Sequence, residues 1–450
     1  MTSKSSSFRI GRVQAYLRNR IWYLCYHENN RRRRPRVGPD REAAKQMAAQ
    51  INAQLEVGAP AALSFEPIAI PDLRNHWLQH HEQVLRSSVQ TVDRYRTATD
   101  HLLRFLEKRP VRHASQFHAM HAEEFVRFLR ALQVSPNGHA NTAKRPLMDK
   151  GVRYVLECCR AMFNHAAKRR HLSPYAENPF RTVEIDRIPI EQARPIELFT
   201  AEQEKAFLEE CDDWQFPLFL TLMLTGLRPG ELSHLLLPED LDLETGWLKV
   251  RNKPKLGWKV KTRNERDIPL VPVLVEVLRR HLGDRRVGPV FRRQRFLQVS
   301  GPALAGNRKH LEQELSRRVE NEQTTRATLL TDKEKLRIGQ RWWQEIGAVP
   351  EDRIRIEFMH LTKKIGLTGF TAPKMLRHMF ATTLQEGRVD PLIRNELMGH
   401  VAAGERSAGH GLSMTAVYTH TRPETKRSQL EEALTARVAV EFARRWLQTS

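Results

Sequence analysis

Apolar residues recur every three or four positions over four stretches in the first half of the chain. These stretches cover residues 70–85, 89–108, 122–132 and 150–170. Such spacing places the apolar side chains on one face of a helix, where they can pack together. We therefore expect a helical domain over residues 64–185.

The first sixty residues show a different pattern. Residues 8–17 and 21–27 are rich in β-preferring side chains such as Trp22 and predict two short strands, with a third extended piece further on. A helix then begins after Asp40, which stands at the position of an N-cap. We expect a small domain over residues 1–60, built from a three-stranded sheet and one helix.

A third domain is expected over residues 196–450, after a linker that contains Pro189 and Pro195. Its apolar stretch 216–224 predicts a buried helix. Three short strands are predicted next, the first two paired as a hairpin, at residues 247–251, 258–262 and 266–270. The remainder is expected to be helical, with a highly charged insertion near 296–345 and a last helix over about 423–448. The predicted fold class is therefore mainly α with small β elements.

The net charge of the chain indicates which class of partner it binds. Its 450 residues include 74 Lys and Arg against 52 Asp and Glu, which gives a formal net charge of +22. A globular protein this basic usually binds a polyanion, and nucleic acid is the leading candidate. The longest apolar stretch, residues 216–227, is too short to cross a bilayer, so no membrane contact is expected. The four cysteines lack the spacing of a metal site or a disulfide framework, which favours reduced thiols in a cytoplasmic protein.

Two basic runs are candidate DNA contacts, although each has a simpler explanation. Arg31, Arg32, Arg33 and Arg34 form either a DNA contact or a solvated loop. Lys168, Arg169 and Arg170 close a predicted helix, where they either bind phosphates or only satisfy the helix dipole. The net charge favours DNA contact for the two runs taken together.

The string Thr225-Gly226-Leu227-Arg228-Pro229-Gly230-Glu231 is the most informative one in the chain. A buried helix stops at Gly226, and a new helix begins with Pro229 at its first position, which suits the fixed φ of proline. Arg228 is thereby held in a turn at the edge of a core. Its guanidinium offers a planar fork of donors that fits two phosphate oxygens.

Further basic and nucleophilic residues follow in a definite order. Lys374 and Arg377 are three residues apart and share one helix face. His400 comes next, in Leu-Met-Gly-His, and Tyr418 follows in Val-Tyr-Thr-His. Each fragment alone is weak, and Tyr418 alone is equally consistent with a core tyrosine. The order Arg, Lys-x-x-Arg, Gly-His and Tyr is the informative signal.

With these motifs the chain resembles the tyrosine recombinases, of the phage or mobile-element integrase type. The resemblance extends over the whole chain and implies an arm-type DNA-binding domain, a helical (SAM-like) core-binding domain and a tyrosine-recombinase catalytic fold. It implies that Arg228 and Arg377 are the two catalytic arginines, that Glu231 supports the first, and that Tyr418 is the nucleophile.

The other site residues are carried over with alternatives. The catalytic lysine of the family precedes a strand that ends in Ile-Pro-Leu, which favours Lys261, with Lys259 as the alternative. Lys374 stands where the family usually has a histidine, and a lysine there would stay charged and bind phosphate. His400 matches the histidine before the nucleophile, and His410 is its rival. His378 is expected to have a supporting role only.

The resemblance implies metal-free and ATP-free cleavage and rejoining of double-stranded DNA attachment sites through a 3′-phosphotyrosine, with no cofactor. It also implies a homotetramer in the synapse, with accessory DNA-bending or directionality factors as further partners. The apolar spacing of the last helix suggests that it docks on a neighbouring subunit. Two alternatives remain open: a type IB topoisomerase-like enzyme and a catalytically silent DNA-binding protein.

Overall fold

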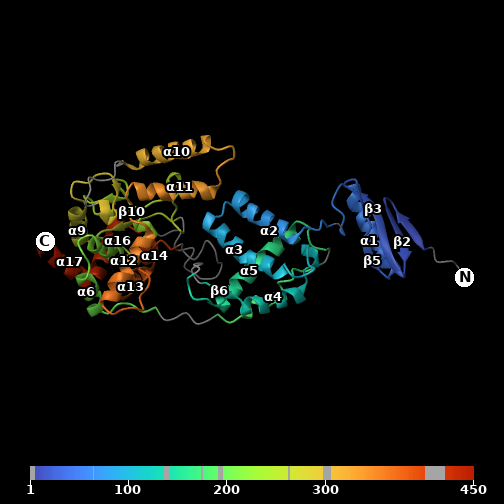
Figure 1. Cartoon of the computed structure of the whole chain (residues 1–450), viewed down its shortest axis with the longest axis horizontal. Helices are drawn as coiled ribbons and strands as arrows, with labels where there is room; N and C mark the ends of the chain where they lie inside the picture. Colours follow the sequence, from blue (N-terminus) through green and yellow to red (C-terminus); the bar gives the residue numbers. More distant parts are fainter. Residues whose placement is uncertain are drawn as a thin grey trace. The chain divides into compact units, whose positions relative to one another are not determined.

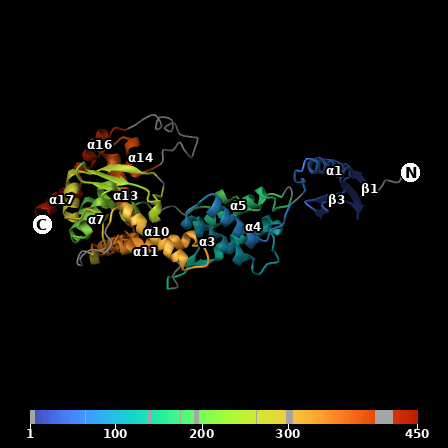
Figure 2. The same ribbon diagram turned by 90° about the horizontal axis from the view of Figure 1, so that it is seen from above.

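The chain divides into two compact units, Met1–Ala193 and Arg194–Ser450 (Figures 1 and 2). The computed structural model describes residues 6–63, 65–135, 141–173, 176–190, 196–261, 264–296, 306–400 and 421–449. Helices dominate both units and the sheets are small, which confirms the predicted fold class. No helix in these ranges is long and apolar enough to cross a bilayer.

The first unit begins with a sheet that packs on one helix (Figure 1). The sheet has the order β1-β2-β3-β4, with β5 also paired to β3. Its elements are β1 Ser7–Ile10, β2 Val13–Arg18, β3 Ile21–Glu28, β4 Arg31–Arg33 and β5 Arg36–Gly38, and the helix is α1 Arg41–Glu56. Trp22 and Leu24 on one face pack against Ala48 and Ile51 of α1.

The sheet has five strands, so the predicted three-stranded sheet is wrong. Gly11, at φ +50°, turns the chain inside the first predicted strand and splits it into β1 and β2. Asn29 and Asn30 also have positive φ, and they return the chain so that β4 pairs with β3. The arginine run is therefore mostly an edge strand rather than a loop.

Four helices form the rest of the first unit, where the sequence pattern predicts them. They are α2 Ile70–Gln79, α3 Val89–Leu106, α4 Ala119–Ala131 and α5 Asp149–Lys168. α2 continues into a π-helical turn, His80–Val84. A single apolar cluster, which includes Trp77, Phe105 and Phe163, lies between the helices. A two-residue pairing of β6 Gln133–Val134 with β7 Arg145–Pro146 joins α4 to α5.

The second unit is organised around α7, Gln215–Thr225, whose residues are almost all buried. Around it lie α6 Ala201–Glu209, α8 Pro229–Leu232, α9 Pro272–Leu282, α12 Glu351–Lys364, α13 Lys374–Glu386, α14 Pro391–Met398, α16 Pro423–Thr435 and α17 Val438–Thr449. One large apolar cluster joins these helices to a small sheet.

The four cysteines of the two units are all free thiols: Cys25, Cys158, Cys159 and Cys211.

The sheet of this unit differs from the predicted hairpin. β10 Trp247–Val250 pairs directly with β11 Arg266–Pro269 and, on its other side, with β9 Leu241–Asp242. Residues 258–261 form no strand, because Trp258 pairs its backbone with Lys253 and closes a local turn. A second pairing joins β8 Leu236–Leu237 to β12 Gly288–Pro289.

The predicted last helix is two helices, α16 and α17, and both pack on their own chain. Leu430, Leu434 and Val440 lie in the large core. Arg437, between the two helices, forms a buried ion pair of 2.5 Å with Glu204 of α6. Leu430 and Leu434 of the face that suggested docking are thus covered within the chain, whereas Val438 and Phe442 are only partly buried. Docking of this helix pair on a neighbour stays a prediction.

The charged insertion is a helical hairpin, which we call the insert. It comprises α10 Arg308–Thr324 and α11 Asp332–Glu345, which lie side by side in both views (Figures 1 and 2). A separate small core lies beneath it, where Leu311, Leu315 and Trp342 meet Leu236 and Leu256. The apolar spacing from Leu311 onward correctly predicts α10.

Candidate active site

Arg228 lies in the turn between α7 and α8. Gly226 ends α7 at φ +60°, and a Cβ there would lie 2.3 Å from Phe380, so only glycine fits. The backbone N–H of Arg228 donates to Glu231 Oε2 at 2.9 Å, and its Nη1 donates to Oε1 at 2.7 Å. The side chain is held at both ends while 23% of it stays exposed.

Glu231 is buried and binds a second arginine. Arg266 on β11 donates to both of its carboxylate oxygens, at 2.6 and 3.2 Å. Burial acts to raise the pKa of Glu231, but hydrogen bonding and charge from Arg266, together with Arg228, lower it overall. The carboxylate therefore stays ionised between two guanidinium groups.

Arg266 is a site residue that the motifs do not reveal. It is buried, and its Nε donates to the carbonyl of Leu397 at 2.8 Å, which ties β11 to α14. The available signal is strand alternation, because Arg266 and the core residue Ile268 are two positions apart and share the inward face. A charged side chain on an inward face needs a buried partner, which here is Glu231.

Arg377 lies on α13 and is also buried. Its Nη1 donates to the carbonyl of Gly226 at 2.6 Å, and its Nη2 donates to the carbonyl of Met398. These carbonyls lie at the ends of α7 and α14, so one guanidinium joins three helices. Burial, followed by the charge of Arg228, lowers the pKa of Arg377 to about 10, so the group remains a cation at neutral pH.

His400 follows α14 and is exposed. Gly399, at φ +59°, ends that helix, and a Cβ on it would lie 2.8 Å from Arg266 Nη1. Partial burial lowers the pKa of His400, and so do the charges of Arg377, Arg228 and Arg266, in that order. His400 therefore lies within the field of all three arginines.

Lys374 and His378 occupy the first turn of α13 and the turn after it. Lys374 is exposed at the first position of the helix. His378 is half-buried, and its pKa is lowered by burial and then by the charges of Lys374 and Arg377. The two residues thus border the arginine cluster on the α13 side.

Lys261 reaches the same region from the loop between β10 and β11. Its side chain is exposed, and its charge acts on Glu351, at the start of α12. That carboxylate lies against the Arg228 turn, because a Cβ on Gly230 would be 3.1 Å from Glu351 Oε2. Lys259, the alternative, is also exposed on this loop.

Other predicted residues lie elsewhere. Tyr418 and His410 fall outside the described residues. The two basic runs, residues 31–34 and 168–170, belong to the first unit. Within the arginine run, Arg33 is 3.5 Å from Glu28 and 3.9 Å from Glu66, and Arg31 is 3.9 Å from Glu66.

The arrangement is built to bind an anion. Three arginines surround a single buried carboxylate in this cluster, which leaves an excess of positive charge, and His400 and Lys374 add donors at its edge. Two of the five N–H groups of Arg377 donate to carbonyls, which fixes the orientation of its guanidinium. Among the described residues there is no group of three or more His, Cys, Asp or Glu that could hold a metal ion.

No family model matches the chain, but two curated proteins are similar to it. Tyrosine recombinase XerC of Thermodesulfovibrio yellowstonii is 28% identical over 241 residues, 54% of this chain and 57% of that protein. Tyrosine recombinase XerC of Pelotomaculum thermopropionicum is 29% identical over 233 residues, 50% of this chain and 58% of that protein. The chain therefore spans a little over half the length of these relatives.

Solved structures of integrases are also similar to this chain. A lambda integrase dimer bound to a COC′ core site has a TM-score of 0.47 at 16% identity, over 86% of this chain and 92% of that one. The Tn1549 transposon integrase in complex with a circular intermediate DNA has a TM-score of 0.45 at 17% identity, over 81% and 99%.

The buried arginine cluster lies on a mainly helical unit and has the charge and the donors to bind an anion. In sequence, the chain is similar to two tyrosine recombinases over about half of its length.

Proposed function

We propose that this chain is a site-specific DNA recombinase that cuts and rejoins double-stranded DNA through a 3′-phosphotyrosine intermediate. The observation that carries the proposal is the cluster of Arg228, Arg266 and Arg377 around Glu231, with His400 in its field. An in-line attack on a phosphodiester builds negative charge on the equatorial oxygens, and fixed cations stabilise that charge without reorganising.

Each predicted residue has a role in this reaction. Tyr418 attacks the scissile phosphate, so that a Tyr–O–P bond forms as the bond to the 5′-oxygen breaks. Lys261 gives a proton to the departing 5′-oxygen. Arg228, Arg377 and His400 bind the phosphate oxygens. In the reverse step a 5′-hydroxyl attacks the phosphotyrosine and reseals the strand.

Lys374 and His378 support this centre. Lys374 lies in solvent at the first position of α13, beside the arginine cluster, so we assign it to phosphate binding rather than proton transfer. His378 packs one turn later and orients that edge. Resealing needs no ATP, because the phosphotyrosine preserves the energy of the broken bond. The fixed cations of the cluster stabilise the developing charge in place of a metal ion.

Four copies acting on two DNA sites would complete strand exchange, with integration or excision of a mobile element as the outcome. The basic residues of the first unit, 31–34 and 168–170, are proposed to bind DNA outside the cleavage point. Accessory DNA-bending or directionality factors, and action in the cytoplasm where the DNA lies, belong to the same proposal.

The test is an adduct assay in EDTA with DNA that flanks the gene. Wild-type protein should give an SDS-resistant protein–DNA adduct, Tyr418→Phe should give none, and Tyr154→Phe should match the wild type. Arg228→Ala should slow adduct formation by about 10²–10³-fold, because it removes a donor to the developing charge.

The outcomes separate the candidate functions. Tight DNA binding without any adduct would show a silent DNA-binding protein. An adduct that relaxes supercoils, but never exchanges strands between two sites, would show a topoisomerase-like enzyme. Exchange that depends on two specific sites supports the recombinase.

A further inference from the structure

The insert contacts the loop that carries Lys261, and it contacts residues that directly follow the turn that carries Arg228. Its small core lies directly on the loop, since Leu256 belongs to that core. The helices α10 and α11 therefore do more than fill a surface position.

Trp343 of α11 touches the Lys261 loop directly and reaches the Arg228 turn through His234. Its Nε1 donates to the carbonyl of Leu256 at 2.9 Å, and its ring packs edge-on against His234, with 4.6 Å between centroids. The ring of His234 also stacks on the ring of Trp258, with 4.8 Å between the ring centroids. His234 Nδ1–H in turn donates to the carbonyl of Gly230, inside the Arg228 turn, at 2.6 Å.

Arg308, at the start of α10, holds the other end of the loop. Its Nη2 donates to the carbonyl of Asn252 at 2.9 Å. The side-chain Oδ1 of Asn252 then accepts from the backbone N–H of Val260, next to Lys261, at 2.9 Å. A short chain of hydrogen bonds therefore runs from the insert to the residue before the proposed acid.

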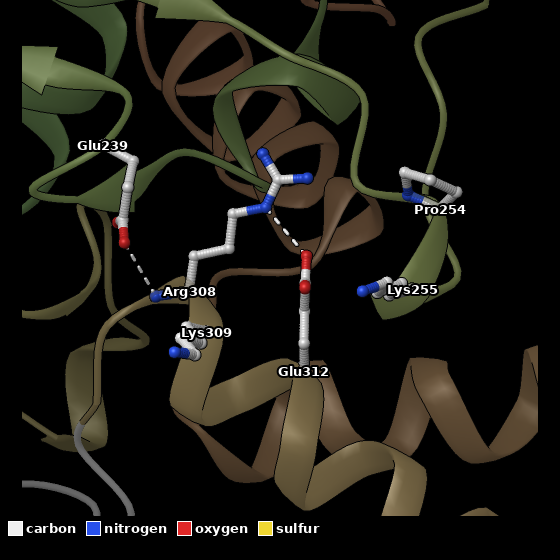
Figure 3. Close-up of a pocket in the computed structure, with 6 residues that line it drawn as sticks. All are labelled: Glu239, Pro254, Lys255, Arg308, Lys309 and Glu312. Carbon is white, nitrogen blue, oxygen red and sulfur yellow. Dashed lines mark hydrogen bonds and ion pairs between the residues drawn. The ribbon is translucent and has the colours of Figure 1, made fainter.

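Further contacts fix Arg308 itself, and Figure 3 shows two of them. Its backbone N–H donates to Glu239 at 3.0 Å, and its Nε donates to Glu312 at 2.8 Å, at the edge of a surface hollow that Lys255 also lines. On the loop side, Lys253 is fully buried and pairs with Asp240 at 2.8 Å. Arg308 of the insert and Lys253 of the loop are thus each anchored to an acidic residue in the body of the second unit.

The loop and the insert also approach closely at two glycines. A Cβ on Gly339 of α11 would lie 3.5 Å from the carbonyl of Leu256 and 3.9 Å from Gly257 Cα. Gly257 has φ +72° and ends the 3₁₀ turn Pro254–Leu256. Backbone meets backbone here, so movement of α11 is transmitted to the loop without flexible side chains in between.

We propose that the insert is a brace that positions Lys261 for proton transfer, with Arg308 and Trp343 as its positioning residues. This rests on the proposed function, in which Lys261 is the acid. A general acid acts only within hydrogen-bonding distance of the departing oxygen, and an error of about 1 Å can cost on the order of 10²-fold in rate.

The test separates positioning from stability by changing the leaving group. In DNA whose scissile 5′-oxygen is replaced by sulfur, the leaving group is a thiolate, which departs without a proton because a thiol pKa is about 8.5. Single-turnover cleavage of the mapped site is measured with both DNAs. Lys261→Ala should be slow on ordinary DNA and near the wild-type rate on the sulfur DNA.

Arg308→Ala and Trp343→Phe should follow the same pattern. We expect a loss of about 10- to 100-fold on ordinary DNA and recovery to within about 3-fold on the sulfur DNA. Arg317→Ala is the matched control, because it removes the same charge from α10 at a residue that pairs with Glu314 of the same helix and is 67% exposed. It should leave both rates unchanged.

Two other results would each reject a part of the proposal. Equal losses on both DNAs for Arg308→Ala and Trp343→Phe would show that the insert only stabilises the unit or binds DNA, and the brace would be rejected while the proposed function stands. If Lys261→Ala is not recovered by sulfur, Lys261 is not the acid, and the brace fails together with that assignment. Thermal unfolding of every variant identifies any loss caused by misfolding.

Discussion

The carboxylate of Glu231 pairs with Arg228 and Arg266 at once, and this explains how a buried site tolerates several positive charges. Without it, the two guanidiniums would face each other and Arg377 with little compensation. A buried charge without its partner is destabilising by several kcal/mol, so this one residue affects both folding and phosphate binding.

We predict that Glu231→Gln lowers the free energy of unfolding by about 3–5 kcal/mol at neutral pH, because it leaves buried arginine charge unpaired. Urea denaturation measures the change. Glu276→Gln is the control, since Glu276 forms an exposed pair with Arg279 and should cost no more than about 1 kcal/mol. A Glu231→Gln variant as stable as the wild type would contradict the pairing.

The same carboxylate gives a pH dependence with a definite sign. The folded-state pKa of Glu231 is lowered below its ordinary value, so its stabilising contribution is complete above that value and is lost as the pH falls through the folded-state pKa. Wild-type protein should therefore lose more stability than Glu231→Gln on acidification below about pH 4.5. Urea denaturation at each pH measures the free energy of unfolding of both proteins. An equal loss of stability in the two proteins would refute this assignment.

At the scale of single residues, the sequence predicts what depends on neighbours in the chain. Arg228 and Glu231 are three positions apart, and their interaction is that of a capping box at the start of α8. Arg266 lies far along the chain from its partner Glu231, and no local pattern specifies which strands meet. Only the three-dimensional fold brings these two side chains together.

At the scale of elements, the apolar spacing predicts helices well and strand pairing poorly. The four helices of the first unit and α10 follow from their own periodicity. The pairing of β10 with β11 excludes the intervening loop, because Trp258 and Lys253 close a turn of their own. Aromatic residues such as Trp258 favour strands statistically, but here the ring is used to pack on His234.

The insert has its own core, and this predicts that it can open separately. Leu311→Ala removes a fully buried side chain from that small core and should cost about 2–5 kcal/mol locally. Hydrogen exchange should accelerate in α10 and α11 while α7 stays protected. The exposed Ser316→Ala on the same helix should change nothing, and equal acceleration in α7 would show one cooperative core instead.

At the scale of the whole molecule, the net charge of +22 predicts DNA binding that weakens steeply with salt. Arg31, Arg32 and Arg34 are exposed, whereas Arg33 is largely covered and faces Glu28. Replacing the three exposed residues with Ala should reduce the slope of log affinity against log salt by about 0.9 for each phosphate that is no longer neutralised. Arg33→Ala should reduce the slope less, and equal slopes for both variants would refute the proposal that the exposed arginines bind DNA.

The arginine contacts also determine when during synthesis the site can exist. Arg377 binds a carbonyl 151 residues earlier in the chain, and Arg266 binds one 131 residues later. Contacts of such long range form late, because the loops between them must close first. A nascent chain still attached to the ribosome before Met398 has emerged lacks one of the carbonyls that hold Arg377, so the cluster cannot assemble until most of the second unit has been translated.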